Sequence, residues 1–153
     1  MKKYSLGFAL FSFFFISQKI NAQVIIQIDA GSRSPFGNIQ SLIIQANGKC
    51  AYYFSTVQGE LKDSTSFVFS KAQTDSLLSQ AERLGFFGLQ KEYKKGVDGA
   101  GIFISINKAG KKKSVSLINS DVPEINAWVM LLNEMLKDRN IYINYGQKSP
   151  SKN

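Results

Sequence analysis

The dipeptide Asn47-Gly48 is the feature that most constrains how this chain can fold. It lies between two apolar runs, residues 39–46 (IQSLIIQA) and residues 49–56 (KCAYYFST). Both Asn and Gly tolerate the positive φ of a type I′ turn, the tightest connection between two antiparallel strands. After a further turn, residues 64–69 (STSFVF) again have the composition of a strand. The sequence therefore predicts a three-stranded antiparallel meander.

The second half of the chain repeats this pattern. Residues 102–107 (IFISIN) and 112–118 (KKSVSLI) alternate apolar and polar side chains around a Lys-Ala-Gly-Lys turn, which predicts a second hairpin. Residues 24–28 and residues 141–145 also have the composition of short strands. The second of these would be a short edge strand, and the two segments could add one strand from each end of the chain to the sheet.

Two other segments have the apolar periodicity of helices that cover a sheet. The first helix begins at Ser70, a favourable N-cap residue, and Gln73 lies at the spacing of a capping box. The second helix begins with Asp121 as its N-cap and has Pro123 in its first turn. Its apolar stripe consists of Ile125, Trp128, Val129, Leu132, Met135 and Leu136.

Together these elements predict an α+β fold in the order β-β-β-α-β-β-α. Because the connections are hairpins, the sheet of about five strands is expected to be antiparallel, with both helices packed on one face. The opposite face would then be open and partly polar. Residues 29–38 are expected to form a loop, and residues 86–93 a packed connection across the sheet edge.

The first 22 residues have the pattern of a secretory signal peptide. Two lysines precede an apolar run at residues 6–16, and a polar stretch leads to Ala22. The run is shorter than the roughly 20 residues that a membrane-spanning helix needs. We therefore expect an exported protein, periplasmic or extracellular, with no stable membrane span after cleavage. An uncleaved N-terminal anchor is the alternative.

The rest of the chain is expected to form one globular domain at residues 23–145, followed by a disordered tail at residues 146–153. Three of the 19 basic residues lie in the signal peptide, so its removal lowers the formal net charge from +8 to +5. With no concentrated basic face in the sequence, nucleic-acid binding is not expected. The chain has no histidine, which excludes Ser-His-Asp and Cys-His catalysis and zinc bound by histidine. Cys50, the single cysteine, is expected to be buried and inert.

The glycine-rich residues 94–103 (KKGVDGAGIF) could form a phosphate-binding or a metal-binding loop. A phosphate loop needs its backbone amides at the start of a helix, whereas these glycines lead into a strand. A calcium loop needs several acidic residues, and only Asp98 is present. We therefore expect a mobile crossover that Asp98 anchors, and we predict no metal site and no cofactor.

The aromatic run Tyr52-Tyr53-Phe54 is the best candidate for a binding surface. Side chains alternate along a strand, so Tyr53 faces one side of the sheet while Tyr52 and Phe54 face the other. The set that avoids the helices, with Lys49, Lys62 and Lys94 nearby and Asp98 in a loop at the rim, would bind an envelope protein or a saccharide. Cross-strand aromatic packing is the alternative interpretation.

Several positions resemble a family of small exported bacterial domains of unknown function. The resemblance covers roughly residues 39–137. It rests on the following positions: Asn47-Gly48, Phe87, Tyr93, Asp98, Ile104, Ile106, Gly110-Lys111, Lys113, Val115, Pro123 and Asn126-Ala127. Many such domains carry paired cysteines before the first hairpin, where this chain has residues 32–37 (SRSPFG). The resemblance implies an exported α+β domain and no particular activity.

These features favour a non-catalytic module that binds a protein or another ligand. A carboxylate-dependent hydrolase is one alternative, since Asp29, Asp63, Glu92 and Asp98 are candidate catalytic acids. It would need two carboxylates about 5–10 Å apart in one cleft. A structural component of the cell envelope is the other alternative.

Overall fold

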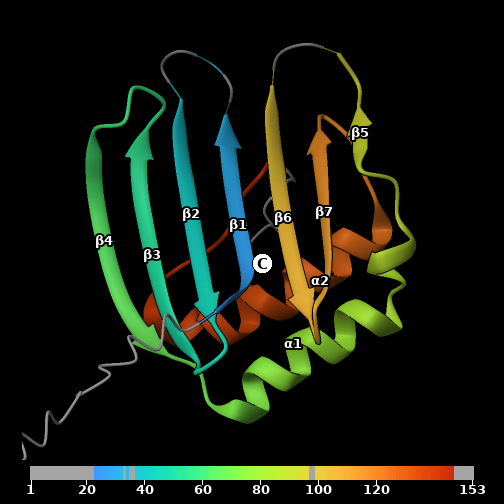
Figure 1. The fold of residues 1–153 in the computed structure, drawn as a ribbon. Helices are drawn as coiled ribbons and strands as arrows, with labels where there is room; N and C mark the ends of the chain where they lie inside the picture. The colour runs from blue at the N-terminus through green and yellow to red at the C-terminus, as the bar shows by residue number, and fades with distance from the viewer. Residues whose placement is uncertain (1–22, 33, 35–36, 97–98, 147–153) are drawn as a thin grey trace, which may run out of the picture.

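The computed structural model describes residues 23–32, 34, 37–96 and 99–146. These residues form one seven-stranded sheet and two helices, and both helices pack on the same face of the sheet (Figure 1). The fold is therefore α+β, as expected. The proposed signal peptide, Asp98 and nearly all of the proposed tail lie outside the described residues.

The strands are β1 (Val24–Ser32), β2 (Asn38–Gln45), β3 (Lys49–Thr56), β4 (Leu61–Val68), β5 (Glu92–Lys94), β6 (Ala100–Lys108) and β7 (Lys111–Ile118). The helices are α1 (Lys71–Arg83) and α2 (Pro123–Leu136), with short 3-10 turns at Phe86–Gly88 and Lys137–Arg139. In space the strands follow the order β4-β3-β2-β1-β6-β7-β5. All neighbours are antiparallel except β5 and β7, which are parallel.

The prediction of about five strands in the order β-β-β-α-β-β-α was wrong, because the described elements follow the order β-β-β-β-α-β-β-β-α. One addition is β1, of which only residues 24–28 were expected to be extended. This strand continues through Asp29 to Ser32, residues that were expected in a loop, and it lies at the centre of the sheet between β2 and β6. Its side chains Ile26, Ile28 and Ala30 are buried. Pairing on both sides satisfies the backbone of a segment whose small residues resemble a loop when read alone.

The strand β5 is the other addition to the predicted sheet. It comprises Glu92–Lys94 and so begins at the end of residues 86–93, where a packed connection was expected. The backbone N–H of Ser116 donates to the carbonyl of Lys91, and that of Lys95 donates to the carbonyl of Ile118. Tyr93 packs against the core from this strand. The connection thus returns along β7 and becomes a short parallel edge strand.

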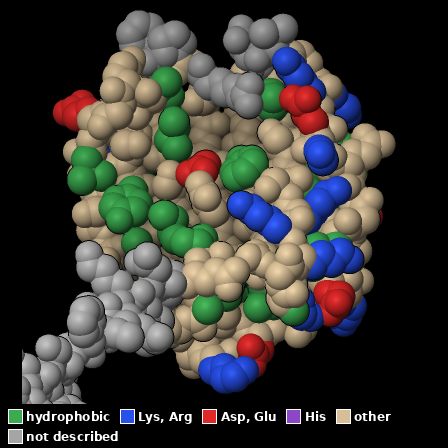
Figure 2. Space-filling view, viewed as in Figure 1, with side chains coloured by type: hydrophobic (Ala, Val, Ile, Leu, Met, Phe, Trp, Pro, Cys, Tyr) green, Lys and Arg blue, Asp and Glu red, His purple; other side chains and the backbone are tan. Residues whose placement is uncertain are grey.

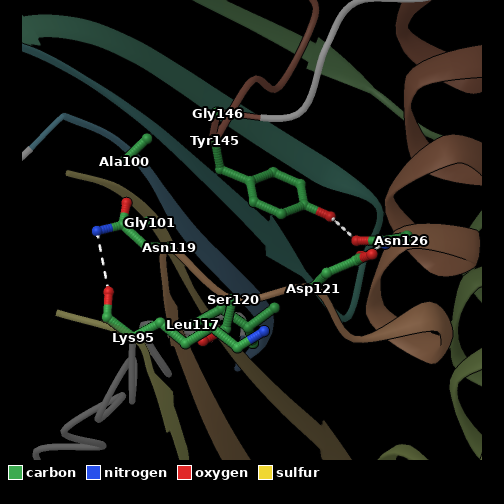
Figure 3. A pocket seen from close by; sticks show the side chains of 10 residues that line it. All are labelled: Lys95, Ala100, Gly101, Leu117, Asn119, Ser120, Asp121, Asn126, Tyr145 and Gly146. Atoms are coloured by element: carbon green, nitrogen blue, oxygen red, sulfur yellow. Dashed lines mark hydrogen bonds between the residues drawn. The ribbon is translucent and has the colours of Figure 1, made fainter.

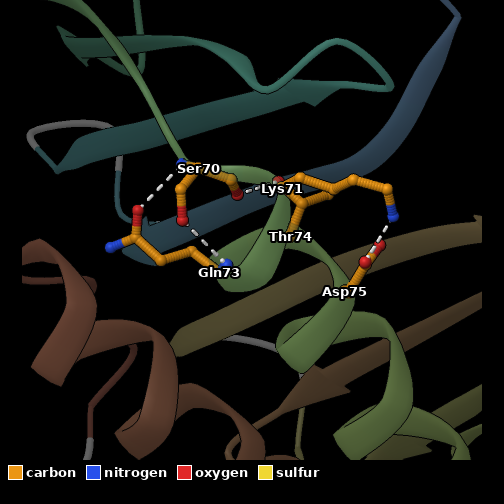
Figure 4. Close-up of polar contacts among 5 residues, drawn as sticks. All are labelled: Ser70, Lys71, Gln73, Thr74 and Asp75. Carbon is orange, nitrogen blue, oxygen red and sulfur yellow. Dashed lines mark hydrogen bonds and ion pairs between the residues drawn. The ribbon is translucent and has the colours of Figure 1, made fainter.

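The predicted start of the first helix is confirmed (Figure 4). The Ser70 hydroxyl accepts a hydrogen bond from the backbone N–H of Gln73, and the Gln73 side chain accepts one from the backbone N–H of Ser70. The predicted N-cap of the second helix is wrong. Val122 occupies that position, and the Asp121 carboxylate instead accepts a hydrogen bond from the Asn126 side chain.

The predicted hairpin at Asn47-Gly48 exists, but its turn differs from the expected type I′ geometry. Only Gly48 has a left-handed φ, at 81°, and its N–H donates to the carbonyl of Gln45. In the second hairpin, both Ala109 and Gly110 have positive φ, at 49° and 81°. The type I′ geometry that was expected between β2 and β3, with positive φ at both turn residues, is therefore found between β6 and β7.

The core lies between the sheet and the helices. Trp128 of α2 is 1% exposed, and its indole Nε1 donates a 2.9 Å hydrogen bond to the carbonyl of Leu77 in α1. Since an indole N–H requires a partner when buried, this bond fixes the two helices relative to each other.

The prediction of an edge strand at residues 141–145 is wrong. This segment runs across the helix side of the sheet, and two side-chain amides bind its backbone. The Asn133 amide of α2 exchanges two hydrogen bonds with Ile143, of 2.8 and 3.1 Å. The Gln40 amide of β2 accepts from the N–H of Asn144 and donates to the carbonyl of Tyr142, at 2.8 and 2.7 Å. These bonds replace the strand pairing that the backbone would otherwise need.

Candidate functional site

The face of the sheet that the helices leave uncovered is the largest candidate surface, and we call it the open face. Its central row runs across the sheet from Tyr53 through Ser41, Asp29 and Phe103 to Ser116, because these residues are directly paired between strands. Figure 2 shows this face with hydrophobic side chains mostly over β4 to β1 and Lys or Arg side chains along the β7–β5 margin. The open face thus combines an apolar half with a basic margin.

The aromatic run predicted as a binding surface is divided between the two faces. Tyr53 lies on the open face and is 41% exposed. Tyr52 is buried in the core, and its hydroxyl accepts a hydrogen bond from Gln40. Phe54 is half-buried and packs against the same core. The alternation predicted from the sequence holds, and only the tertiary structure shows which side is free.

Lys94 does not lie near Tyr53. It is on β5, five strands away in the sheet order, which corresponds to about 24 Å. Lys94 pairs with Ile118 of β7, and the same row of paired residues continues across the open face to Gly101 and Gly31. Lys94 therefore belongs to the basic margin and not to the aromatic cluster. Asp98, the other predicted site residue, lies outside the described residues.

Asp29 lies in the middle of the open face, a position that the sequence reading assigned to a loop. Its two carboxylate oxygens accept hydrogen bonds from the Ser41 hydroxyl, at 2.6 Å, and the Gln27 amide, at 3.0 Å. Both donors are neutral. These bonds hold the carboxylate in a polar centre between the exposed Tyr53 and Phe103 rings.

Two hollows mark the open face. One, of about 180 Å³, is lined by the paired glycines Gly31 and Gly101 and by Asp29 and Phe103. The other is a shallow hollow of about 400 Å³ over β2, β3 and β4, and Ile43, Ala51 and Val68 contribute to its lining. The apolar half of the face is thus contoured and not flat.

Of the candidate catalytic acids, Asp29, Asp63 and Glu92 lie in the described part of the chain, and these three do not form the pair that a hydrolase would need. Asp29 and Glu92 share one row of the open face but are three strands apart, a separation of about 14 Å. Asp63 pairs with Phe54 and so faces the opposite side of the sheet. In the described part of the chain, no group of His, Cys, Asp and Glu side chains could hold a metal ion.

Cys50 is buried, and burial raises the pKa of its thiol to about 11, an increase that backbone hydrogen bonding at Phe69 only partly opposes. A rise of two units from 9 lowers the thiolate fraction about 100-fold near neutral pH. We therefore predict that iodoacetamide modifies native Cys50 at least about 100-fold more slowly than the urea-unfolded chain. Mass spectrometry of timed samples measures both rates, and equal rates would show an accessible, reactive thiol.

A separate hollow, of about 610 Å³, lies at the end of the sheet (Figure 3). We call it the end pocket. Tyr145 points across it, and its hydroxyl donates a hydrogen bond to the Asn126 amide oxygen. The Asn126 amide nitrogen donates in turn to Asp121. Sequence reasoning missed this pocket because its residues come from five separate segments, and the only local signal was the cluster of Asn, Ser and Asp at residues 119–121.

The fold and these surfaces define a two-layer α+β protein with one uncovered sheet face and a polar pocket at the sheet's end. A scan against protein-family models and a search of curated proteins found no match to this chain. Among the described residues, no helix is both long and apolar enough to cross a membrane.

Proposed function

We propose that this protein is an exported, non-catalytic binding module that holds a partner protein against its open face. The observation that carries the proposal is the solvent-facing apolar set on strands β3, β4 and β6. Val68, Tyr53 and Phe103 are 61%, 41% and 36% exposed, and none of them is covered by a helix. Exposed apolar side chains that gather on one face of a folded protein are typical of protein interaction sites.

The charge distribution specifies the kind of partner. Lys94 and Lys112 are exposed on the strands that form the β7–β5 margin, next to the apolar half. A matching partner presents an apolar patch to Tyr53 and Val68 and carboxylates to this margin, because complementary charge aligns two surfaces as they meet. We therefore expect binding to weaken as salt screens the charges.

A matched pair of double variants tests this proposal. Tyr53→Ala with Val68→Ala removes two side chains of the open face, which are 41% and 61% exposed. Tyr142→Ala with Met130→Ala removes a comparable pair, 47% and 66% exposed, from the helix side. Each protein is immobilised and incubated with detergent extract of the cell envelope. We expect wild type and the helix-side variant to capture the same partner, and the open-face variant to lose it by about 10-fold or more.

Equal capture by all three proteins would refute an open-face site. A saccharide partner would give a different result, because it would stack on the Tyr53 ring and depend little on Val68. Single variants at these two positions therefore separate the two classes of partner. Circular dichroism of each variant confirms that the fold is retained before capture is compared.

A further inference from the structure

The end pocket adjoins the smaller hollow of the open face, with which it shares Gly101 and Leu117. Its charged residues, Lys95 and Asp121, are not part of the open-face site of the proposed function, and it is assembled from distant parts of the chain. The start of β6 contributes Ala100 and Gly101, and the last turn of the C-terminal segment contributes Tyr145 and Gly146. The remaining wall comes from Lys95 after β5, from the link between β7 and α2, and from Asn126 in α2. Figure 3 shows these side chains around one hollow.

The neutral polar groups of the end pocket are already oriented. Tyr145 is 6% exposed, and burial, followed by the negative charge of Asp121, raises the pKa of its phenol well above the ordinary value. The phenol therefore remains a donor to the Asn126 carbonyl oxygen, which fixes the Asn126 amide with its nitrogen toward Asp121. This hydrogen-bonded chain holds one oxygen of the Asp121 carboxylate in place.

Both charged groups of the end pocket remain available to a ligand. The second Asp121 oxygen has no hydrogen-bond partner in the described part of the chain. Ion pairs within the described ranges join Lys71 to Asp75 and Lys108 to Glu82, so Asp121 and Lys95 take part in neither. The backbone of Lys95 is held by Ile118 and Asn119, whereas its ammonium group is exposed.

We propose that the end pocket binds a small zwitterion of the amino-acid class, with the ligand ammonium at Asp121 and its carboxylate at Lys95. An anion and a cation that share one hollow without pairing match the two charges of such a ligand. The Asn119 and Ser120 side chains line the same pocket. Ala100, Gly101 and Gly146 add no polar side chain to its wall.

NMR titration of the full gene product, as the cell processes it, tests this inference. Each standard amino acid is added in turn while the backbone amide signals of Gly101, Asn119 and Gly146 are followed. We expect at least one amino acid to shift these signals. Its N-acetyl form lacks the ammonium and its carboxamide form lacks the carboxylate, so each should bind about 10-fold more weakly or worse.

Two isosteric variants complete the test. Asp121→Asn keeps an acceptor for Asn126 but removes the negative charge, and Lys95→Gln removes the positive charge. Each should weaken binding about 10-fold, whereas Glu134→Gln with Lys137→Gln, two exposed positions toward the end of α2, should leave it unchanged. The proposal is overturned if no amino acid shifts the three signals, if the blocked forms bind as well as the free one, or if both pocket variants bind like wild type. The blocked ligands decide the question with wild-type protein alone, should a variant fail to fold.

Discussion

Replacement of Asn133 by leucine is expected to lower the free energy of unfolding by about 2–6 kcal/mol, because it leaves two buried backbone groups without partners. The Asn133 amide both donates to the Ile143 carbonyl and accepts from the Ile143 N–H. Each unpaired buried group costs about 1–3 kcal/mol. Urea unfolding followed by circular dichroism measures the loss.

The same variant should release the C-terminal segment before the rest of the fold opens. Ile143 is 1% exposed beneath α2, and its amide should exchange with solvent much faster in Asn133→Leu than in wild type. Glu134→Ala, an exposed neighbour on the same helix, is the control and should change stability by less than about 0.5 kcal/mol. If the leucine variant were as stable as the control, the amide bridge would not hold this segment.

Replacement of Trp128 by alanine is expected to cost about 3–5 kcal/mol, the range for removal of a large aromatic side chain from a core. Trp128 fills the contact between the sheet and α2 and also bonds to the Leu77 carbonyl of α1. Trp128→Phe keeps one aromatic ring in the core but loses the indole N–H and the second ring, so we expect a smaller loss, of about 1–2 kcal/mol. A loss for Trp128→Phe well below that for Trp128→Ala would show that most of the contribution comes from the buried aromatic ring.

Chemical unfolding should be followed by far-ultraviolet circular dichroism, since Trp128 is the only tryptophan of the chain. The control is Met130→Ala, two residues further along α2, where the side chain is 66% exposed and should contribute less than about 0.5 kcal/mol. Equal losses for Trp128→Ala and Met130→Ala would mean that α2 does not pack through the face assigned to it.

Most of the local structure could be predicted from the sequence. The capping box at Ser70 and Gln73 formed as predicted, and the apolar stripe of α2 faces the core. These features depend on neighbouring residues, and their periodicity appears directly in the sequence. The turn at Asn47-Gly48 shows the limit of such rules. The hairpin formed without the predicted type I′ geometry, and the turn with positive φ at both residues is found in the second hairpin.

The binding surfaces were predicted only in part. The alternation of side chains along β3 placed Tyr53 on one face of the sheet and Tyr52 and Phe54 on the other. The sequence could not show which of these two faces the helices would cover. Lys94 proved remote from Tyr53 because the strand order was not predicted. Asp29 was read as a loop residue, although pairing with β2 and β6 places it at the centre of the open face.

The sequence by itself determined both helices, most of the strands and which side chains alternate along them, because local hydrogen bonding and side-chain periodicity act over a few residues. Only the tertiary structure decided that β1 is central, that residues 141–145 lie across the helix side, and that Lys95, Asp121 and Tyr145 share one pocket. Those outcomes depend on hydrogen bonds and packing between segments up to about a hundred residues apart, as in the bond from Gln40 to Asn144. Such contacts form only when the whole core assembles, so no local pattern encodes them.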